Sequence, residues 1–378
     1  MALLAALAVC LPAAAISALP ASGAEPVPTR VDSFRACIAG GGTTDLLLLI
    51  DESSSLRGSD PDNARVTSAA YLIEQLTKSA NASKAKVNVA ISAFANSYNV
   101  VEGWTALSSA TLPQLQGSIG SLKDRVNGME TDYWTALDGA RKSLAAQSAS
   151  RPNGQSCQAV VWFTDGGISY TVRQNDADKA AFGSEKPFAP GIQISNEAAA
   201  EQVRQAAMGD ICRSGGVADQ LRSSGIALFG IGLQGGSGDP SDFSFLQSVV
   251  TAKSAAQGPD CGTLTVPVPG EFHLATDIDS LLLAFDGISS PGSRPIAQET
   301  GICQVSRCLD QAHRFVLDQS TPSVRVLATA DGTGLQASVM SPSGRIIELP
   351  RAALGVESTV TSDANVLKYS WISEKTLT

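Results

Sequence analysis

The feature that most constrains this chain is the apolar run at residues 46–50, which ends directly at Asp51. Five apolar residues without a polar break are typical of a strand buried on both faces. Such strands lie in the middle of parallel sheets, where helices cover both sides. Ser53 and Ser55 then alternate along the loop that follows. The sequence therefore predicts a helix-covered sheet with a polar loop at one strand end.

The oxygens of Asp51, Ser53 and Ser55 are hard ligands of the kind that Mg²⁺, Mn²⁺ or Ca²⁺ prefers. No His or Cys is nearby, which disfavours zinc and a nucleophile. The alternative is a Ser-rich turn in which Asp51 caps the next helix, since Asp and Ser are common in turns and at helix N-termini. This short pattern alone is compatible with both interpretations.

Strand and helix patterns alternate over residues 43–288, which predicts an α/β domain with a mostly parallel sheet. A second fully buried strand, at 158–164, ends at Asp165 and Gly166. The other expected strands are 86–94, 98–104 (a possible edge), 226–232 and 272–275. The expected helices are 63–77, 112–122, 134–147, 196–208, 210–222, 243–250 and 277–285.

Residues 1–24 form an apolar run with small residues at its end, which fits a secretory signal peptide. A basic start is missing from this run. The alternative is a membrane anchor, which its short length and the interruptions at Pro12 and Pro20 disfavour.

Three other segments lie outside the α/β domain. Residues 25–42 are a polar, Gly-rich lead-in, and residues 289–302 are a linker that begins with Ser, Pro and Gly. Residues 303–378 carry short alternating segments and no helix pattern, which predicts a small β-sandwich domain. The chain ends soon after the last of these segments, so an incomplete domain is one expectation.

Six cysteines remain when Cys10 is assigned to the signal peptide. An even number behind a signal peptide indicates disulfides and an extracytoplasmic location, secreted or at the cell surface. Cys37 and Cys157 each precede a strand that we expect to be a neighbour of the other. The favoured pairs are Cys37–Cys157, Cys212–Cys261 and Cys303–Cys308.

The carboxyl ends of the two buried strands are expected to meet. In a doubly wound sheet, ligand sites form where the strand order reverses, outside the carboxyl ends of the strands. Asp51 and Asp165 end the two strands expected to be neighbours at that point, and Thr131 precedes a helix that starts on the same side. Two carboxylates can neutralise a divalent cation, while three hydroxyls complete the cage without overcharging it.

This order of residues resembles the metal-ion-dependent adhesion site (MIDAS) of the von Willebrand factor A-domain family. The resemblance covers about residues 43–287, and its 55–62 segment is similar to secreted bacterial members. It implies a six-stranded sheet in the order 3-2-1-4-5-6 with strand 3 antiparallel, Mg²⁺ or a similar ion, and a non-catalytic binding role. The residues that carry it are Asp51, Ser53, Ser55, Thr131 and Asp165, with Asp132 and Gly166 beside them.

Two acidic residues beside these ligands have two interpretations each. Glu52 is either a solvated side chain or a group behind the metal ligands, and Asp132 either caps a helix or holds a metal-bound water. Gly166 lies at the rim. The long insertion over about 166–198 is a lid, a partner-specific rim or a plain surface loop.

The leading functional prediction is a metal-dependent adhesion module that binds a protein ligand through an Asp or Glu carboxylate of that partner. The alternatives are a structural envelope protein with a fold-stabilising ion and, less favoured, a metal-assisted hydrolase. The net charge of −9 argues against nucleic acid. No nucleophile or phosphate-binding motif is present, so we expect neither catalysis nor a small-molecule substrate.

Overall fold

The structure is a computed structural model that describes residues 29–151, 156–234, 239–253 and 260–275, and the backbone of five later strands between residues 323 and 374. The predicted signal peptide, the linker, the helix expected over 277–285 and the Cys303–Cys308 pair lie outside the described residues.

Six strands form one central sheet: β1 (Thr43–Asp51), β2 (Lys86–Phe94), β3 (Tyr98–Ala106), β4 (Cys157–Thr164), β5 (Ala227–Leu233) and β6 (Gly270–Ala275). Their order is β3-β2-β1-β4-β5-β6. Every neighbouring pair is parallel except β2 and β3, which pair antiparallel at one edge. This arrangement confirms the predicted doubly wound fold, including the edge strand.

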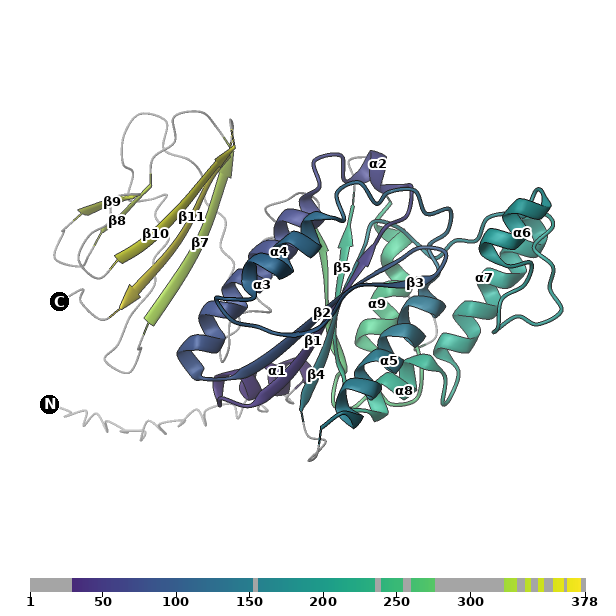
Figure 1. The fold of residues 1–378 in the computed structure, drawn as a ribbon, viewed down its shortest axis with the longest axis horizontal. Helices are drawn as coiled ribbons and strands as arrows, with labels where there is room; N and C mark the ends of the chain where they lie inside the picture. The colour runs from purple at the N-terminus through teal and green to yellow at the C-terminus, as the bar shows by residue number, and fades with distance from the viewer. Residues whose placement is uncertain are drawn as a thin grey trace, which may run out of the picture.

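The helices are α1 (Arg30–Ala39), α2 (Leu56–Ser59), α3 (Ala64–Ser83), α4 (Leu112–Gly120), α5 (Tyr133–Ala149), α6 (Asp176–Phe182), α7 (Glu197–Cys212), α8 (Val217–Ser223) and α9 (Ser244–Thr251), with a 3-10 turn, η1 (Pro240–Phe243). Helices α1, α3 and α4 cover one face of the sheet, and α5, α7, α8 and α9 cover the other (Figure 1). None of the helices in the described ranges has the length and apolar content that a membrane crossing requires.

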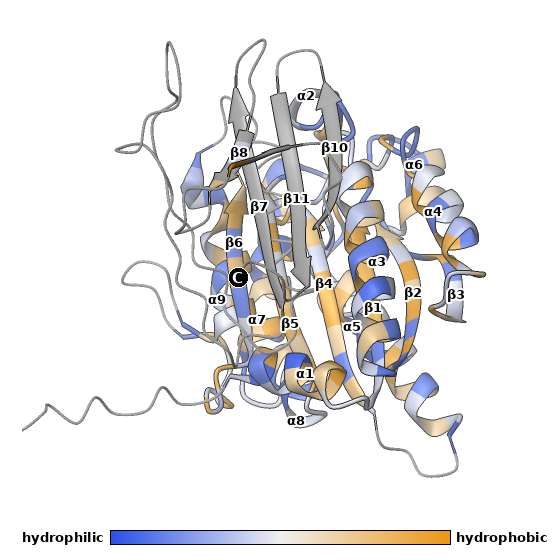
Figure 2. Cartoon of the chain, turned by 90° about the vertical axis from the view of Figure 1, so that its left-hand side faces the viewer, coloured by the Kyte–Doolittle hydropathy of each residue, from blue (hydrophilic) through white to orange (hydrophobic). Residues whose placement is uncertain are grey.

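Strand β1 is buried on both faces because its apolar residues alternate between two cores. Leu46, Leu48 and Ile50 pack into the core under α1, α3 and α4. Leu47 and Leu49 pack into the opposite core. Successive side chains of a strand point to opposite faces, so a doubly covered strand needs an unbroken apolar run. Figure 2 shows these strands as largely hydrophobic, with hydrophilic and hydrophobic residues mixed along the helices around them.

Helix α1 occupies part of the expected lead-in, so the α/β domain begins before residue 43. Thr29 and Asp32 form a capping box at its start, in which each side chain accepts a hydrogen bond from the other's backbone N–H. Arg35 bonds both carboxylate oxygens of Glu271 on β6, at 3.0 and 2.8 Å. The apolar side chains that α1 buries are Val31, Phe34 and Ile38.

Two of the three predicted disulfides are confirmed. Cys37 at the end of α1 pairs with Cys157 at the start of β4, with 6.4 Å between the Cα atoms. Cys212 at the end of α7 pairs with Cys261, with 4.4 Å between the Cα atoms. The first bond ties α1 to the sheet, and the second ties the end of α7 to the segment before β6.

The helical region after the insertion differs from the prediction at its break. Helix α7 runs on to Cys212, and α8 starts only at Val217. The chain turns at Gly215, whose φ of 66° favours glycine, and not at residue 209.

The strands after residue 322 are antiparallel. Strands β7 (Ser323–Asp331), β10 (Val356–Asp363) and β11 (Val366–Glu374) form one sheet in the order β10-β11-β7. Strands β8 (Ala337–Met340) and β9 (Ile346–Leu349) form a two-stranded sheet. Short antiparallel strands agree with an all-β segment, while the β-sandwich domain stays a prediction.

Candidate metal-binding site

Asp51 and Asp165 lie at the carboxyl ends of neighbouring parallel strands. β1 and β4 are paired in register up to Ile50 and Phe163. One residue further, the Thr164 hydroxyl donates a 2.6 Å hydrogen bond to Asp51 Oδ2. Asp51 is fully buried, whereas Asp165 is partly exposed. The strand pairing therefore brings the two carboxylates together at the carboxyl ends of the central strands.

The loop after β1 folds back over these carboxylates. The Ser53 N–H donates to Asp51 Oδ1 at 2.7 Å. The Ser53 and Ser55 hydroxyls lie 3.0 Å apart and donate to Asp165 Oδ1 at 3.4 and 3.0 Å. Ser59, one turn further in α2, donates to Asp165 Oδ2. Four of the five predicted ligands are thus linked by hydrogen bonds, and Ser59 is an additional hydroxyl.

A second loop, which carries Thr131, packs against the first. Gly128 pairs with Ser53 in a short parallel bridge, and its carbonyl accepts from the Ser54 N–H at 2.8 Å. A Cβ on Gly128 would lie 2.1 Å from the Cβ of Ala95, so only glycine allows this approach. The Tyr133 hydroxyl donates to the Gly166 carbonyl. Contacts to both halves of the site therefore flank Thr131.

Thr131 itself is held by its backbone. Its N–H and C=O exchange hydrogen bonds of 3.1 and 3.2 Å with Ser169. Its side chain is buried, and no hydrogen bond within the described residues joins its hydroxyl to the other four predicted ligands. Thr131 is thus on the adjoining loop rather than inside the hydrogen-bonded cluster.

The electrostatics of the cluster are unfavourable for two carboxylates. Burial, and secondarily the negative charge of Asp165, raise the pKa of Asp51 to about 7. Burial also raises the pKa of Asp165. Neither carboxylate takes part in any ion pair of the described residues. A carboxylate pair without a basic partner is a place where a bound cation would relieve both desolvation and repulsion.

The donor set fits a hard divalent cation. Two carboxylates and several hydroxyls are oxygen ligands of the type that Mg²⁺, Mn²⁺ and Ca²⁺ accept. In the described ranges, no group of three or more His, Cys, Asp or Glu side chains is arranged to hold a metal. A cation at this strand end would therefore depend on the serine and threonine oxygens in addition to Asp51 and Asp165.

The expectation of a solvated Glu52 is wrong. Its carboxylate is largely buried, accepts a 2.8 Å hydrogen bond from Asn99 and forms a 2.7 Å ion pair with Arg125. The side chain ties the ligand loop to β3 and to the loop before Thr131. Gly166 presents its carbonyl to Tyr133 and Thr164.

Asp132 is a helix cap, as one of its two interpretations predicted. It accepts a 3.0 Å hydrogen bond from the Thr135 N–H at the start of α5. It also accepts from the Tyr170 hydroxyl at 2.9 Å and forms a 3.0 Å ion pair with Lys186. The contacts to Tyr170 and Lys186 come from the insertion.

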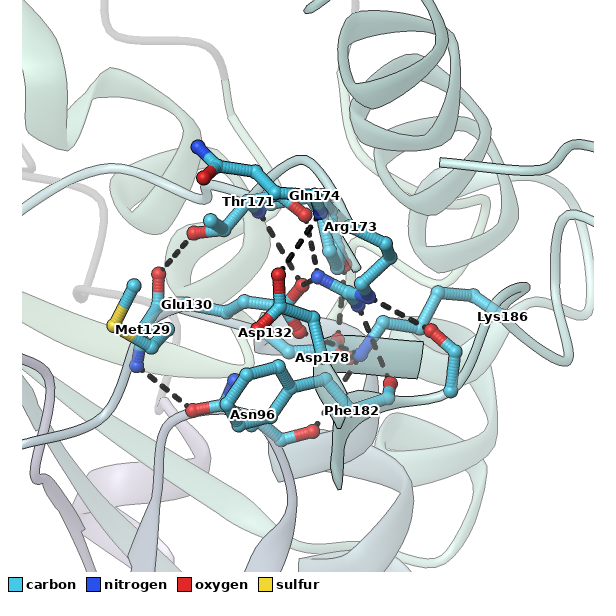
Figure 3. A network of polar contacts seen from close by, with 12 residues as sticks. Asn96, Met129, Glu130, Asp132, Thr171, Arg173, Gln174, Asp178, Phe182 and Lys186 are labelled. Carbon is cyan, nitrogen blue, oxygen red and sulfur yellow. Dashed lines mark hydrogen bonds and ion pairs between the residues drawn. The ribbon is translucent and has the colours of Figure 1, made fainter. Parts of the chain in front are cut away.

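A buried ionic network that no sequence pattern predicted lies beside the site (Figure 3). Glu130 is paired with Arg173 at 2.6 Å and with Lys186 at 2.7 Å. Lys186 bridges Glu130 and Asp132, the two neighbours of Thr131. The partners are separated by more than forty residues, so no local pattern marks them.

Comparison with known proteins bears on this region directly. Residues 46–167 match the von Willebrand factor type A domain. The matched segment begins within β1 and ends just after Asp165, so it contains all five predicted ligands of the adhesion site. A search of curated proteins finds no match to this chain.

The solved structures that match this chain share little sequence with it. The PilB minor pilin of Streptococcus sanguinis is 13% identical, with 65% of this chain and 60% of that chain covered and a TM-score of 0.43. The vWF domain of the type V pili tip protein Mfa5 of Porphyromonas gingivalis is also 13% identical, with 68% and 98% covered and a TM-score of 0.38. Proximal thread matrix protein 1 of the mussel byssus, with a zinc-occupied MIDAS motif, is 15% identical, with 67% and 46% covered and a TM-score of 0.38. This chain thus spans about 60% of the length of PilB.

Proposed function

We propose that this protein is a metal-dependent protein-binding module with an adhesive role. The observation that carries the proposal is the pair Asp51 and Asp165, brought together at one strand end without a basic side chain among their contacts. Its position within the matched von Willebrand factor type A segment supports the same conclusion.

In this proposal Asp51, Ser53, Ser55, Thr131 and Asp165 hold one divalent cation, with Mg²⁺ favoured and Mn²⁺ or Ca²⁺ as substitutes. When bound, the cation supplies a positive centre that attracts a carboxylate of the partner. Asp51 lies at the buried end of the cluster and Ser55 at its exposed end. This gradient of exposure supports a site that is anchored in the sheet and open to a protein ligand.

We also propose that the module works outside the cytoplasm. Two disulfides in a chain of this size favour an oxidising compartment. No base with a suitable position beside Asp165 is evident in the described cluster, so we favour binding over hydrolysis.

The test has two stages. Mn²⁺ and Mg²⁺ binding is measured by titration calorimetry on the wild type, Asp165→Asn and the control Asp176→Asn, whose carboxylate is exposed on α6. Only Asp165→Asn is expected to lose binding, and equal binding by all three proteins would refute the assigned site.

The second stage tests for a carboxylate ligand. Peptide pairs that differ only in a central Asp or Asn are displayed on an array and probed with the wild type in Mg²⁺ or EDTA. We expect capture by Asp peptides alone, and only in Mg²⁺. Capture that persists in EDTA would refute the metal-mediated mechanism.

A further inference from the structure

The loop that carries Thr131 is clamped by the insertion through charges that are almost fully buried. Glu130 and Asp132, on either side of Thr131, are 1% and 0% exposed. Their partners Arg173 and Lys186 are 4% and 5% exposed. Two negative and two positive charges make this four-residue network neutral, in contrast to the Asp51–Asp165 pair.

Arg173 also links the two segments of the insertion that flank α6. Arg173 precedes α6, and Lys186 follows it. Arg173 Nε donates to the Gly183 carbonyl at 2.7 Å, and its guanidinium lies over the Phe182 ring. Arg173 therefore joins both arms of the insertion to Glu130, as Figure 3 shows.

Further hydrogen bonds from the insertion reach Glu130, Thr131 and Asp132. Ser169 pairs with the Thr131 backbone on both sides. The Thr171 N–H donates to Glu130 at 3.3 Å, and the Tyr170 hydroxyl donates to Asp132. The backbone of the loop is thus fixed by the insertion, while none of these contacts uses the Thr131 hydroxyl.

We propose that Arg173 and Lys186 are positioning residues for Thr131. In this proposal the insertion fixes the loop conformation in which the Thr131 hydroxyl faces the cation. The inference rests on the proposed cation at Asp51 and Asp165. Buried ion pairs add little net stability compared with apolar packing, but they can specify one loop conformation. A ligand held in place before binding loses less conformational freedom when the cation arrives.

Removing one basic side chain from the network should loosen the loop and weaken metal binding. Mutation of a residue that orients a metal ligand typically lowers metal affinity by about 10- to 100-fold. We therefore expect Lys186→Met to weaken Mn²⁺ binding by about tenfold. The matched control is Lys179→Met, because Lys179 forms an exposed ion pair with Asp176 within the same insertion.

A double-mutant cycle distinguishes positioning from general stability. The Mn²⁺ affinity of the full chain is measured from the electron paramagnetic resonance signal of free Mn²⁺. The proteins are the wild type, Lys186→Met, Thr131→Val, their double variant, Lys186→Arg, Asp51→Asn and the control Lys179→Met. If Lys186 acts through Thr131, the double variant binds Mn²⁺ no more weakly than Thr131→Val alone. Lys186→Arg, which keeps the charge, should recover most of the affinity.

Hydrogen exchange in EDTA supplies a second measurement that needs no metal. Lys186→Met is expected to speed exchange of the amides of residues 130–133, and Lys179→Met is not. If Lys186→Met fails to fold, Arg173→Met takes its place with the same expected pattern.

The outcomes separate the two proposals. Additive losses of Mn²⁺ affinity from Lys186→Met and Thr131→Val, or wild-type affinity in Lys186→Met, would refute the positioning role of Arg173 and Lys186. Unchanged binding in Thr131→Val with lost binding in Asp51→Asn would overturn it too, and would leave the metal site standing. A wild type that binds no Mn²⁺ would refute both.

Discussion

Replacing Asp51 by asparagine is expected to stabilise the metal-free protein at neutral pH. Burial and the charge of Asp165 raise the pKa of Asp51 from 3.8 to about 7. Asparagine keeps the two local hydrogen bonds, because its oxygen can accept from the Ser53 N–H and its amide can donate to the Thr164 hydroxyl. The substitution therefore removes the charge and little else.

The size of the effect follows from the change in pKa. Each unit corresponds to about 1.4 kcal/mol, so an ionised Asp51 costs the folded state on the order of 4 kcal/mol above pH 7. Because the pKa of Asp51 is raised in the folded state, the wild type has its full stability below about pH 4, where Asp51 is protonated in both states. It loses this stability progressively as the pH rises through about 7. The advantage of Asp51→Asn should thus be about 4 kcal/mol at pH 8 and about 2 kcal/mol at pH 5.

The assay is urea unfolding in EDTA at pH 5 and pH 8, followed by tryptophan fluorescence, since Trp162 is fully buried in the α/β core. Asp176→Asn serves as the control because its carboxylate is exposed. Added Mg²⁺ should stabilise the wild type at pH 8 and leave Asp51→Asn unchanged. A difference between wild type and Asp51→Asn below about 1 kcal/mol at pH 8, or one that does not vary with pH, would refute the argument from charge burial.

Three further variants test the scaffold around the site. Arg65→Met leaves the buried Asp60 carboxylate without its 2.6 Å ion pair, and should cost about 3–5 kcal/mol in urea unfolding. Replacing Cys37 and Cys157 by serine opens a loop with a sequence separation of 120, and calorimetry should give a lower melting temperature and a loss of up to ~5 kcal/mol. Gly128→Ala forces a Cβ onto Ala95 beside the Ser53 loop, and should lower Mn²⁺ affinity more than Gly117→Ala, where a Cβ meets nothing within 4 Å.

The central part of the fold could be predicted because its signals are local. The apolar run of β1 has no polar residue to expose, so a doubly covered strand is the direct interpretation. Asp51, Ser53 and Ser55 are close in sequence, and Asp165 directly follows a second apolar strand. The pairing of Cys37 with Cys157 followed from the expected adjacency of the strands that they precede.

Some of the features that the sequence analysis did not predict had a recognisable sequence pattern, and one did not. Helix α1 had one: a Thr29–Asp32 capping pair precedes apolar residues at helical spacing, and the Gly-rich end of the segment obscured it. Ser59 also had one, because it lies four residues after Ser55 and so one helical turn away. The pairing of Glu130 with Lys186 had none, since 56 residues separate them and only the folded insertion brings them together.

The two acidic pairs at the carboxyl end of the sheet differ in how their negative charge is compensated. Glu130 and Asp132 are buried, and the insertion supplies Arg173 and Lys186 to neutralise them. Asp51 and Asp165 end the adjacent strands, yet none of the described ion pairs includes them. Since buried carboxylates need a compensating positive charge, the insertion satisfies the first pair from within the chain. The second pair has no such partner among the described residues, and because burial raises the pKa of Asp51 to about 7, this carboxyl group loses its proton as the pH rises through that value. A divalent cation, as proposed above, would therefore compensate the charge of the Asp51–Asp165 pair at neutral and higher pH.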